Sequence, residues 1–319
     1  MTAVVARAPG KLFLTGEWAV LAGAPAVVAA VDRWAEARFE PDGPTGTLVV
    51  ESLAEGRAVR LDDGAARDGD AAAVAAAWRA TGAGGGRLVV DSRAFLVGER
   101  KLGLGRSAAT LVATVAALRG GAQPPAVLPA ALTANAILQD GRGSGADVAA
   151  AVHGGVVEVR RAGEGLAITP RRLPPGLRLV AGWTGAAAPT APLLARFAGR
   201  AVAEPPALAA LGAVAVAAAD AVARGDAGAL LDAVERTTPL LDALGAQAGV
   251  PIVTPALRAL VAAARRAGAV AKPAGAGGGD CGIALATSAR CAAAVRAAWR
   301  EAGILPLDVA VAPAGVTLG

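Results

Sequence analysis

Histidine and cysteine are nearly absent from this sequence, which has one histidine, His153, and two cysteines, Cys281 and Cys291, among its 319 residues. Zinc sites in proteins draw most of their ligands from these two residue types, so a zinc site of the Cys/His type cannot be assembled. Two cysteines also exclude a disulfide scaffold and are typical of buried, reduced thiols. The sequence therefore predicts a cytoplasmic protein without a zinc centre.

Aromatic residues are also scarce, at 3% of the chain, and tyrosine is absent. Proteins that bind single-stranded nucleic acids stack the bases on aromatic side chains, so this composition argues against such a partner. The net charge is +5, but the arginines are spread along the chain and form no basic segment. We therefore expect small anionic ligands and no nucleic acid.

Charged residues make up only 18% of the chain against 55% hydrophobic residues, which excludes a disordered protein. The amino-terminal segment has no basic stretch followed by an apolar core and a cleavage site, so no export signal is predicted. The uncharged stretch 179–195 is interrupted by glycine, proline and threonine, and no membrane span is expected. These features predict a soluble globular protein, and we expect it to be a monomer or a homodimer.

The chain divides into two halves near Pro174 and Pro175, where the composition shifts. The first half opens with short apolar segments typical of strands, at 4–8, 12–15, 27–31 and 35–39, with a turn expected at Pro9 and Gly10 between the first two. It continues with alanine-rich helical segments. The second half begins with a strand expected at 177–183 and continues with helices, and its later strands are expected at 269–272, 282–286 and 309–311. Because strands and helices are segregated within each half, we predict an α+β fold with domains at 1–174 and 175–319.

Glycine, by contrast, is abundant, and three glycine clusters stand beside predicted helices or strands. They are KLGLGRSAA at 101–109, GRGSGAD at 141–147 and GAGGGDCG at 275–282. Glycine loops let backbone amides approach phosphate oxygens, and a helix amino terminus favours negative charge. The spacing matches neither the Walker loop nor the dinucleotide fingerprint. Three such loops together predict a phosphate-binding site of another type.

With the segment APGKLFLTGE at 8–17, the first and third of these loops resemble, in order, the three motifs of the GHMP kinase superfamily. The resemblance covers nearly the whole chain. Within the superfamily, GSGADVAA at 143–150, GWTG at 182–185 and the third loop are similar to bacterial-type phosphomevalonate kinases. Mevalonate kinases carry a glutamate about three helical turns before the catalytic aspartate. The corresponding stretch here, ANAIL at 134–138, has no carboxylate, which disfavours that branch.

The resemblance implies an amino-terminal domain like domain 2 of ribosomal protein S5, a ferredoxin-like carboxy-terminal domain and an active site in the cleft between them. It implies phosphoryl transfer from ATP to 5-phosphomevalonate, with Mg²⁺. Mevalonate kinase and diphosphomevalonate decarboxylase remain open alternatives. A non-catalytic ligand-binding regulator on the same fold is a further one.

The resemblance also implies roles for single residues. Lys11 is expected to bridge the donor and acceptor phosphates, and Asp147 to orient Lys11 or the acceptor. The alternative roles are a solvated lysine at a strand start for Lys11 and a carboxylate favoured at a helix amino terminus for Asp147. The acceptor is expected to contact Lys11, Arg142, Ser144, Gly145, Asp147, Gly277 and Gly278.

The second motif is expected to hold the ATP phosphates through Lys101, Gly103, Leu104, Gly105, Arg106, Ser107 and Ala108. Ser107 is the candidate magnesium ligand, with helix capping as the alternative role. The family usually has two serines after Gly-Leu-Gly, whereas this chain has Arg106 and Ser107. We expect the Arg106 guanidinium to contact a phosphate, and the adenine contacts to come from 38–95.

Overall fold

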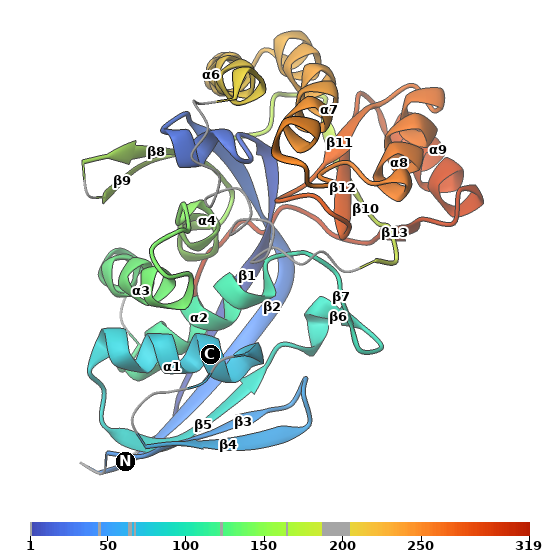
Figure 1. Ribbon diagram of the computed structural model, residues 1–319. Coiled ribbons are helices and arrows are strands. Elements are labelled where there is room, and N and C mark those ends of the chain that lie inside the picture. Colours follow the sequence, from blue (N-terminus) through green and yellow to red (C-terminus); the bar gives the residue numbers. More distant parts are fainter. Residues whose placement is uncertain are drawn as a thin grey trace.

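The computed structural model describes residues 2–43, 46–62, 66, 68–121, 124–163, 165–186 and 205–319. These residues form an eight-stranded sheet, a four-stranded sheet and a small two-stranded sheet, with helices packed against the two larger ones (Figure 1). Strands and helices are segregated, as predicted, and the fold class is α+β.

The eight-stranded sheet is built around two long antiparallel strands, β1 (Val4–Thr15) and β2 (Ala26–Gly43). The path β14-β1-β2-β5-β3-β4 runs across it, and β8 and β9 extend it from β2. The remaining strands are β3 (Leu48–Ser52), β4 (Arg57–Leu61), β5 (Gly85–Asp91), β8 (Val156–Ala162), β9 (Gly165–Arg171) and β14 (Thr317–Leu318).

The short strands expected from the sequence are wrong in length: β1 continues through Pro9 and Gly10, and β2 spans both 27–31 and 35–39. Pro9 and Gly10 do not turn the chain; they shift the register between β1 and β2, as a β-bulge does. A Cβ atom added at Gly10 would lie 2.5 Å from the carbonyl oxygen of Leu104. Glycine at the bulge therefore lets the second motif lie directly against β1.

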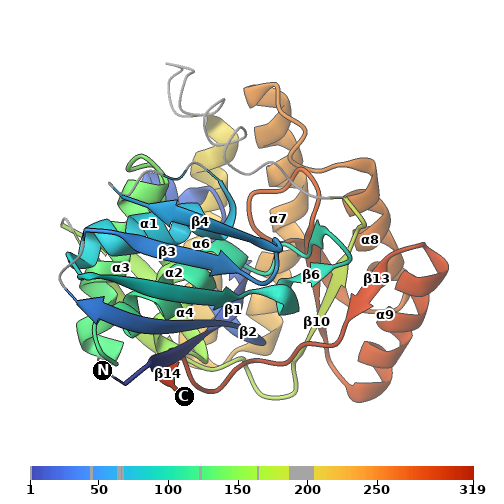
Figure 2. The same cartoon turned by 90° about the horizontal axis from the view of Figure 1, so that it is seen from below.

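Four helices cover one face of this sheet (Figure 2). Their sequences are rich in alanine, which favours helix and allows close packing against the strands. They are α1 (Gly69–Thr81), α2 (Arg106–Leu118), α3 (Pro124–Leu138) and α4 (Ala146–His153). Short segments complete this half: 3₁₀ helices η1 (Ala19–Ala22) and η2 (Arg93–Phe95), and the hairpin of β6 (Leu96–Val97) and β7 (Arg100–Lys101).

The four-stranded sheet has the order β11-β12-β10-β13. Its strands are β10 (Arg178–Trp183), β11 (Val270–Pro273), β12 (Cys281–Ala286) and β13 (Leu305–Leu307). Its helices are α6 (Pro206–Arg224), α7 (Ala227–Ala248), α8 (Pro255–Arg266) and α9 (Ala289–Glu301). Asp226, Thr254 and Ser288 cap the last three through side-chain oxygens, which explains where these helices begin.

The end of the chain returns to the first sheet. The strand predicted at 309–311 is wrong: β13 lies earlier, and Val311 forms only an isolated bridge with Val31 of β2. Strand β14 then pairs with β1. The final residues, although they lie in the predicted second domain, thus pair with the sheet of the first half. The division at 174 and 175 stays a prediction.

Helix α6 is the one helix among the described residues that is long and apolar enough to cross a bilayer, with a mean hydropathy of 1.8 in its most apolar window. Half of that window is buried inside the protein. Leu211 and Ala215 of α6 pack with Trp18 and Leu241, as expected of a core helix. The stretch 179–195 considered from the sequence lies partly outside the described residues, and the absence of a membrane partner stays a prediction.

Candidate active site

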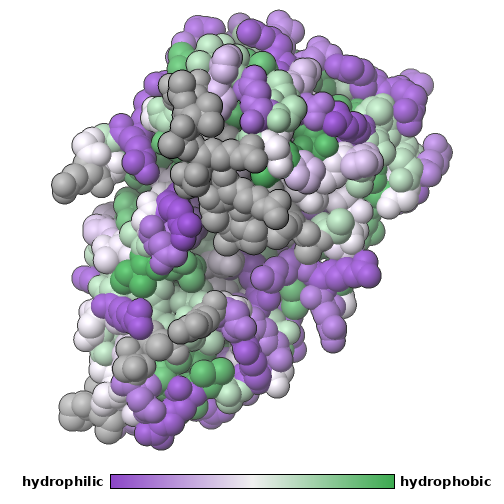
Figure 3. Space-filling view, in the orientation of Figure 1, coloured by the Kyte–Doolittle hydropathy of each residue, from purple (hydrophilic) through white to green (hydrophobic). Residues whose placement is uncertain are grey.

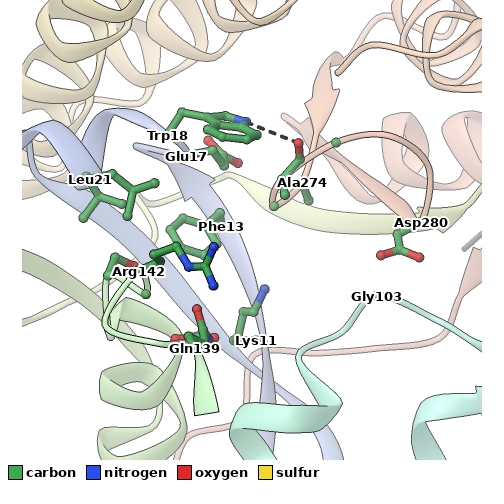
Figure 4. A pocket seen from close by; sticks show the side chains of 17 residues that line it. Lys11, Phe13, Glu17, Trp18, Leu21, Gly103, Gln139, Arg142, Ala274 and Asp280 are labelled. Carbon is green, nitrogen blue, oxygen red and sulfur yellow. Dashed lines mark hydrogen bonds between the residues drawn. The ribbon is translucent and has the colours of Figure 1, made fainter. Parts of the chain in front are cut away.

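A cavity of about 140 Å³ lies where β1, η1 and all three motifs meet (Figure 4). Charged, aromatic and glycine residues share its lining, so it offers both charge and close backbone approach. The lining residues are Lys11, Phe13, Glu17, Trp18, Val20, Leu21, Gly103, Gln139, Arg142, Gly143, Ser144, Asp147, Ala274, Gly275, Ala276, Gly277 and Asp280.

Lys11 extends from β1 into this cavity. Its backbone N–H donates to the carbonyl of Leu104 at 2.7 Å, which fastens the second motif to the first. Its aliphatic chain lies along Gly105, where a Cβ atom would come within 2.8 Å of the lysine Cγ. The ammonium lies 5.1 Å from the centroid of the Phe13 ring and donates no hydrogen bond to any described residue. This cation therefore faces the cavity available for an anion.

Asp147 enters the cavity from the first turn of α4, beside the loop 141–147. One of its oxygens accepts the backbone N–H of Val148 at 3.0 Å, and the carboxylate forms no ion pair among the described residues. The Ser144 hydroxyl accepts the N–H of Ala146 at 3.3 Å. Arg142 is half-exposed, with its guanidinium 2.6 Å from Asp140. The loop thus presents one cation and one carboxylate to the same space.

The third motif is held by backbone contacts that require its glycines. Gly278 donates its N–H to Ile252 at 2.8 Å, and a Cβ at Gly277 would lie 2.4 Å from the same carbonyl oxygen. The Asp280 carbonyl accepts both the N–H and the hydroxyl of Thr184, at 2.9 and 3.0 Å. A Cβ at Gly103 would meet the Asp280 side chain at 2.5 Å, so the second and third motifs are in direct contact.

Cys281, next in the third motif, is a packing residue, as predicted. Its thiol is fully buried and lies against the carbonyl oxygen of Leu102. Burial raises the pKa of the Cys281 thiol far above its ordinary value, with a smaller contribution from Asp280. The thiol therefore stays protonated and cannot act as a nucleophile.

A buried ion pair that the sequence did not reveal joins the two halves of the protein behind the cavity. Lys272 of β11 donates to a carboxylate oxygen of Glu17, which follows β1. The Lys272 side chain is 0% exposed, and burial lowers its pKa while the Glu17 charge opposes that shift. Glu17 ends the segment 8–17 and Lys272 lies three residues before the loop 275–282. The two residues are 255 positions apart, and nothing in the sequence indicates that they meet.

Arg106 lies elsewhere than the sequence analysis expected. Its side chain is only 10% exposed and is turned toward β3 and α1, where it lies 2.7 Å from both Glu55 and Asp70. Its Nε donates to the Ser92 hydroxyl at 2.8 Å. The physical reason is Asp70, which is buried and would otherwise lack a cation. In this arrangement the guanidinium is paired with protein carboxylates, and its contact with a phosphate stays a prediction.

The predicted site residues fall into two sets. Six line the cavity: Lys11, Gly103, Arg142, Ser144, Asp147 and Gly277. The others lie outside it: Lys101, Leu104, Gly105, Arg106, Ser107, Ala108, Gly145 and Gly278. Of these, Ser107 is exposed and makes no capping bond, and Lys101 is exposed on β7. Among the lining residues to which the sequence had assigned no role are Phe13, Glu17 and Gln139.

A second, more open cavity of about 410 Å³ lies beside the first turn of α2. It is lined by Ala54, Glu55, Arg57, Asp68, Gly69, Leu96, Glu99 and Arg106. The second motif thus has a cavity on each side. On the face of the molecule seen in Figure 3, hydrophilic residues are spread over the described surface and do not gather in one patch.

The fold and the three converging loops define a GHMP kinase. The family described as GHMP kinases C terminal matches residues 218–305. Phosphomevalonate kinase of Streptomyces sp. (strain CL190) is 36% identical over 369 aligned positions, which cover 98% of each chain. The chain therefore belongs to the phosphomevalonate kinase family and is an ATP-dependent kinase.

Solved structures show the same fold over the whole chain. A Lin0012 protein from Listeria innocua superposes with a TM-score of 0.84 at 23% identity, covering 100% of this chain and 99% of that one. Phosphomevalonate kinase of Streptococcus pneumoniae, in complex with phosphomevalonate and AMPPNP, gives 0.80 at 23% identity, covering 98% and 100%. Mevalonate kinase of L. major in complex with R-mevalonate gives 0.73 at 23%, covering 97% and 96%.

Proposed function

We propose that this kinase transfers the γ-phosphoryl group of ATP to the phosphate of (R)-5-phosphomevalonate, giving (R)-5-diphosphomevalonate and ADP in the mevalonate pathway. The observation that carries the proposal is the Lys11 ammonium, which faces the cavity and has no hydrogen-bond partner among the described residues. The activity named for the Streptomyces relative and the ligands of the Streptococcus pneumoniae structure support the choice of substrate.

Charge neutralisation is the main task at this site. The second pKa of a phosphate ester is about 6, so the attacking oxygen of the acceptor is largely ionised at neutral pH and needs no strong base. Repulsion between this anion and the ATP phosphates is the larger obstacle. Lys11 lies between the motifs, where it contacts both phosphates, and Arg142 adds a second cation on the acceptor side. The Asp147 carboxylate orients the Lys11 ammonium.

ATP is assigned to the second motif. The backbone amides at the start of α2 and the helix dipole favour phosphate there. The cavity of about 410 Å³ beside α2 offers space for the nucleoside, with contacts from 54–57, inside the stretch expected from the sequence, and from the β6–β7 hairpin. Phosphates of the two substrates then meet at Gly103 and Gly105, next to Lys11.

Magnesium is included in the proposal because the available oxygen ligands suit it. The described residues contain no group of three His, Cys, Asp or Glu side chains that would hold a metal alone. Mg²⁺ in kinases is held by substrate phosphates with one or two protein oxygens, so such a group is not required. The Ser107 hydroxyl, exposed and free of a capping bond, fits as one ligand. Bound there, Mg²⁺ neutralises charge on the ATP phosphates.

The proposal also includes the cellular compartment, the partners and the oligomeric state of the enzyme. We place the enzyme in the cytoplasm, because both cysteines are free thiols. Its partners are the two small substrates, with no nucleic acid and no membrane, and the protein acts as a monomer or a homodimer.

A coupled assay of ADP release tests the function directly. The purified protein is given ATP and magnesium with mevalonate, 5-phosphomevalonate or 5-diphosphomevalonate in parallel. We expect 5-phosphomevalonate to give the highest kcat/KM. Faster turnover of mevalonate, or release of CO₂ from 5-diphosphomevalonate, would overturn the assignment in favour of the related activities. No turnover of any of the three would favour a non-catalytic regulator.

A further inference from the structure

The Glu17 carboxylate has one satisfied oxygen and one unsatisfied oxygen. Oε1 is paired with the Lys272 ammonium. Oε2 is buried and has no hydrogen-bond partner in the part of the chain that the structure describes, and Glu17 lines the cavity that holds Lys11 and Asp147. Its side chain is only 2% exposed. A carboxylate oxygen is therefore held out of bulk water, at the wall of the proposed acceptor site.

Leaving such an oxygen without a donor is costly, on the order of 1–3 kcal/mol and more for a charged group. Glu17 cannot turn toward solvent, because Lys272 is fully buried and holds its other oxygen. The next residue is fixed as well: Trp18 has φ 62°, and its indole N–H donates to the Ala276 carbonyl at 3.2 Å (Figure 4). The unsatisfied oxygen is thus a rigid acceptor at the cavity wall that lacks its donor.

The chemistry of the acceptor identifies that donor. The molecule 5-phosphomevalonate carries a phosphate, a carboxylate and a tertiary hydroxyl. At neutral pH the carboxylate has no proton to donate and the phosphate is largely dianionic, and both anions are repelled by Glu17. Only the hydroxyl is a neutral donor. In the view of Figure 4 the Phe13 ring lies between Lys11 and Glu17, so the two charged side chains are set apart along the cavity.

We propose that Glu17 Oε2 accepts a hydrogen bond from the tertiary hydroxyl of the acceptor, and that Lys272 is the positioning residue that aims it. This inference rests on the proposed function and adds a specificity contact to it. A hydrogen bond from a hydroxyl to a buried carboxylate is charge-assisted and so among the stronger ones. An acceptor without the hydroxyl leaves Oε2 unsatisfied and is rejected for that reason.

The test compares 5-phosphomevalonate with its analogue that lacks the tertiary hydroxyl, 3-methyl-5-phosphooxypentanoate. For the wild-type enzyme we expect kcat/KM to be about 10- to 100-fold higher for the hydroxylated compound, the range of a charge-assisted bond. The double variant Glu17→Met with Lys272→Met removes both charges together, which avoids leaving one buried ion unpaired. In it the preference should fall to within about threefold.

A second variant, Glu17→Gln, keeps the proposal testable if the double variant of Glu17 and Lys272 does not fold. Glu17→Gln keeps an acceptor for Lys272 and makes the bond to the hydroxyl neutral. Since charge-assisted bonds are roughly twice as strong as neutral ones, a preference of about 100-fold should fall to about tenfold. The exposed pair of Asp242 and Arg258 serves as the matched control, and Asp242→Asn with Arg258→Met should keep the full wild-type preference.

Each outcome bears on a defined claim. Equal turnover of the two compounds by the wild-type enzyme would overturn the inference and mean that a water satisfies Oε2. A full preference retained in both Glu17 variants would overturn it as well, since the hydroxyl would then be bound elsewhere. Absence of wild-type turnover of 5-phosphomevalonate would instead overturn the proposed function.

Discussion

Two clusters of charge lie on either side of the start of α2, and they differ in how far the protein satisfies them. Arg106 is almost fully buried, with contacts to Glu55, Asp70 and Ser92 between 2.7 and 2.8 Å. Lys11, on the cavity side, donates no hydrogen bond from its ammonium to any described residue. The cluster around Arg106 is complete without a ligand, whereas the one around Lys11 is not.

This difference separates structural charges from functional ones. Asp70 receives hydrogen bonds from Ser52, Ser92 and Thr110 in addition to the Arg106 contact, so the first cluster ties α1 and α2 to the sheet. Removing a member of it leaves a buried charge unpaired. Removing Lys11 breaks no ion pair among the described residues, and in the proposed mechanism it takes charge from the bound substrates and leaves Asp147 without the ammonium that it orients. The first change should lower stability, and the second should lower activity.

The largest effect on activity is expected for Lys11→Met. Methionine keeps the packing along Gly105 and removes the cation, so kcat should fall by at least about 100-fold, the scale of a lost preorganised charge. The melting temperature should stay within about 2 °C of the wild-type value. Steady-state ADP release and thermal unfolding measure the two quantities, and a variant with near-wild-type kcat would remove Lys11 from the mechanism.

The next largest loss of activity is expected for Asp147→Asn, again about 100-fold in kcat. The neutral amide lacks the negative charge that orients the Lys11 ammonium. The bond from Val148 to Oδ1 can be kept by the amide oxygen, so folding should be unaffected. KM for ATP is expected to change less than kcat. Should KM for ATP rise while kcat is preserved, Asp147 would be a nucleotide ligand and not an orienting group.

Arg106→Met tests the opposite cluster and should mainly lower stability. Unpairing the buried Asp70 is expected to reduce the free energy of unfolding by about 3 kcal/mol, with kcat of the folded enzyme within about threefold of wild type. Denaturant titration and ADP release measure these. A rise of about tenfold or more in KM for ATP without a loss of stability would support the phosphate contact expected from the sequence.

The smallest effect is expected for Asp242→Asn. Asp242 forms an exposed ion pair with Arg258, at a distance similar to those in the Arg106 cluster but without its burial. Such pairs contribute less than about 1 kcal/mol. The Arg258 hydrogen bond lowers the pKa of Asp242, so this contribution is present above the ordinary value of 3.8 and is lost as the pH falls through the lower folded value. Wild-type and variant stabilities should therefore converge at acidic pH. Divergence there would contradict the assigned pair.

Local sequence patterns predicted most of the helices and strands and the three glycine loops. Glycine clusters and helix caps depend only on residues that are close together in the sequence. Long-range pairing was not accessible in this way. The Glu17–Lys272 pair, the bridge from Val311 to β2 and the turn of Arg106 toward Asp70 depend on which segments meet after folding. Arg106 shows this best, since its position beside a phosphate loop suggested a ligand, and its partner lies 36 residues earlier on α1.

The most direct test of the contrast between the two clusters measures kcat and the free energy of unfolding on the same preparations of Lys11→Met and Arg106→Met. We predict that Lys11→Met loses at least about 100-fold in kcat with wild-type stability. Arg106→Met should lose about 3 kcal/mol of stability with kcat nearly retained. The reverse pattern, an unstable Lys11 variant and a folded but inactive Arg106 variant, would contradict the assignment of function to the charge that faces the cavity.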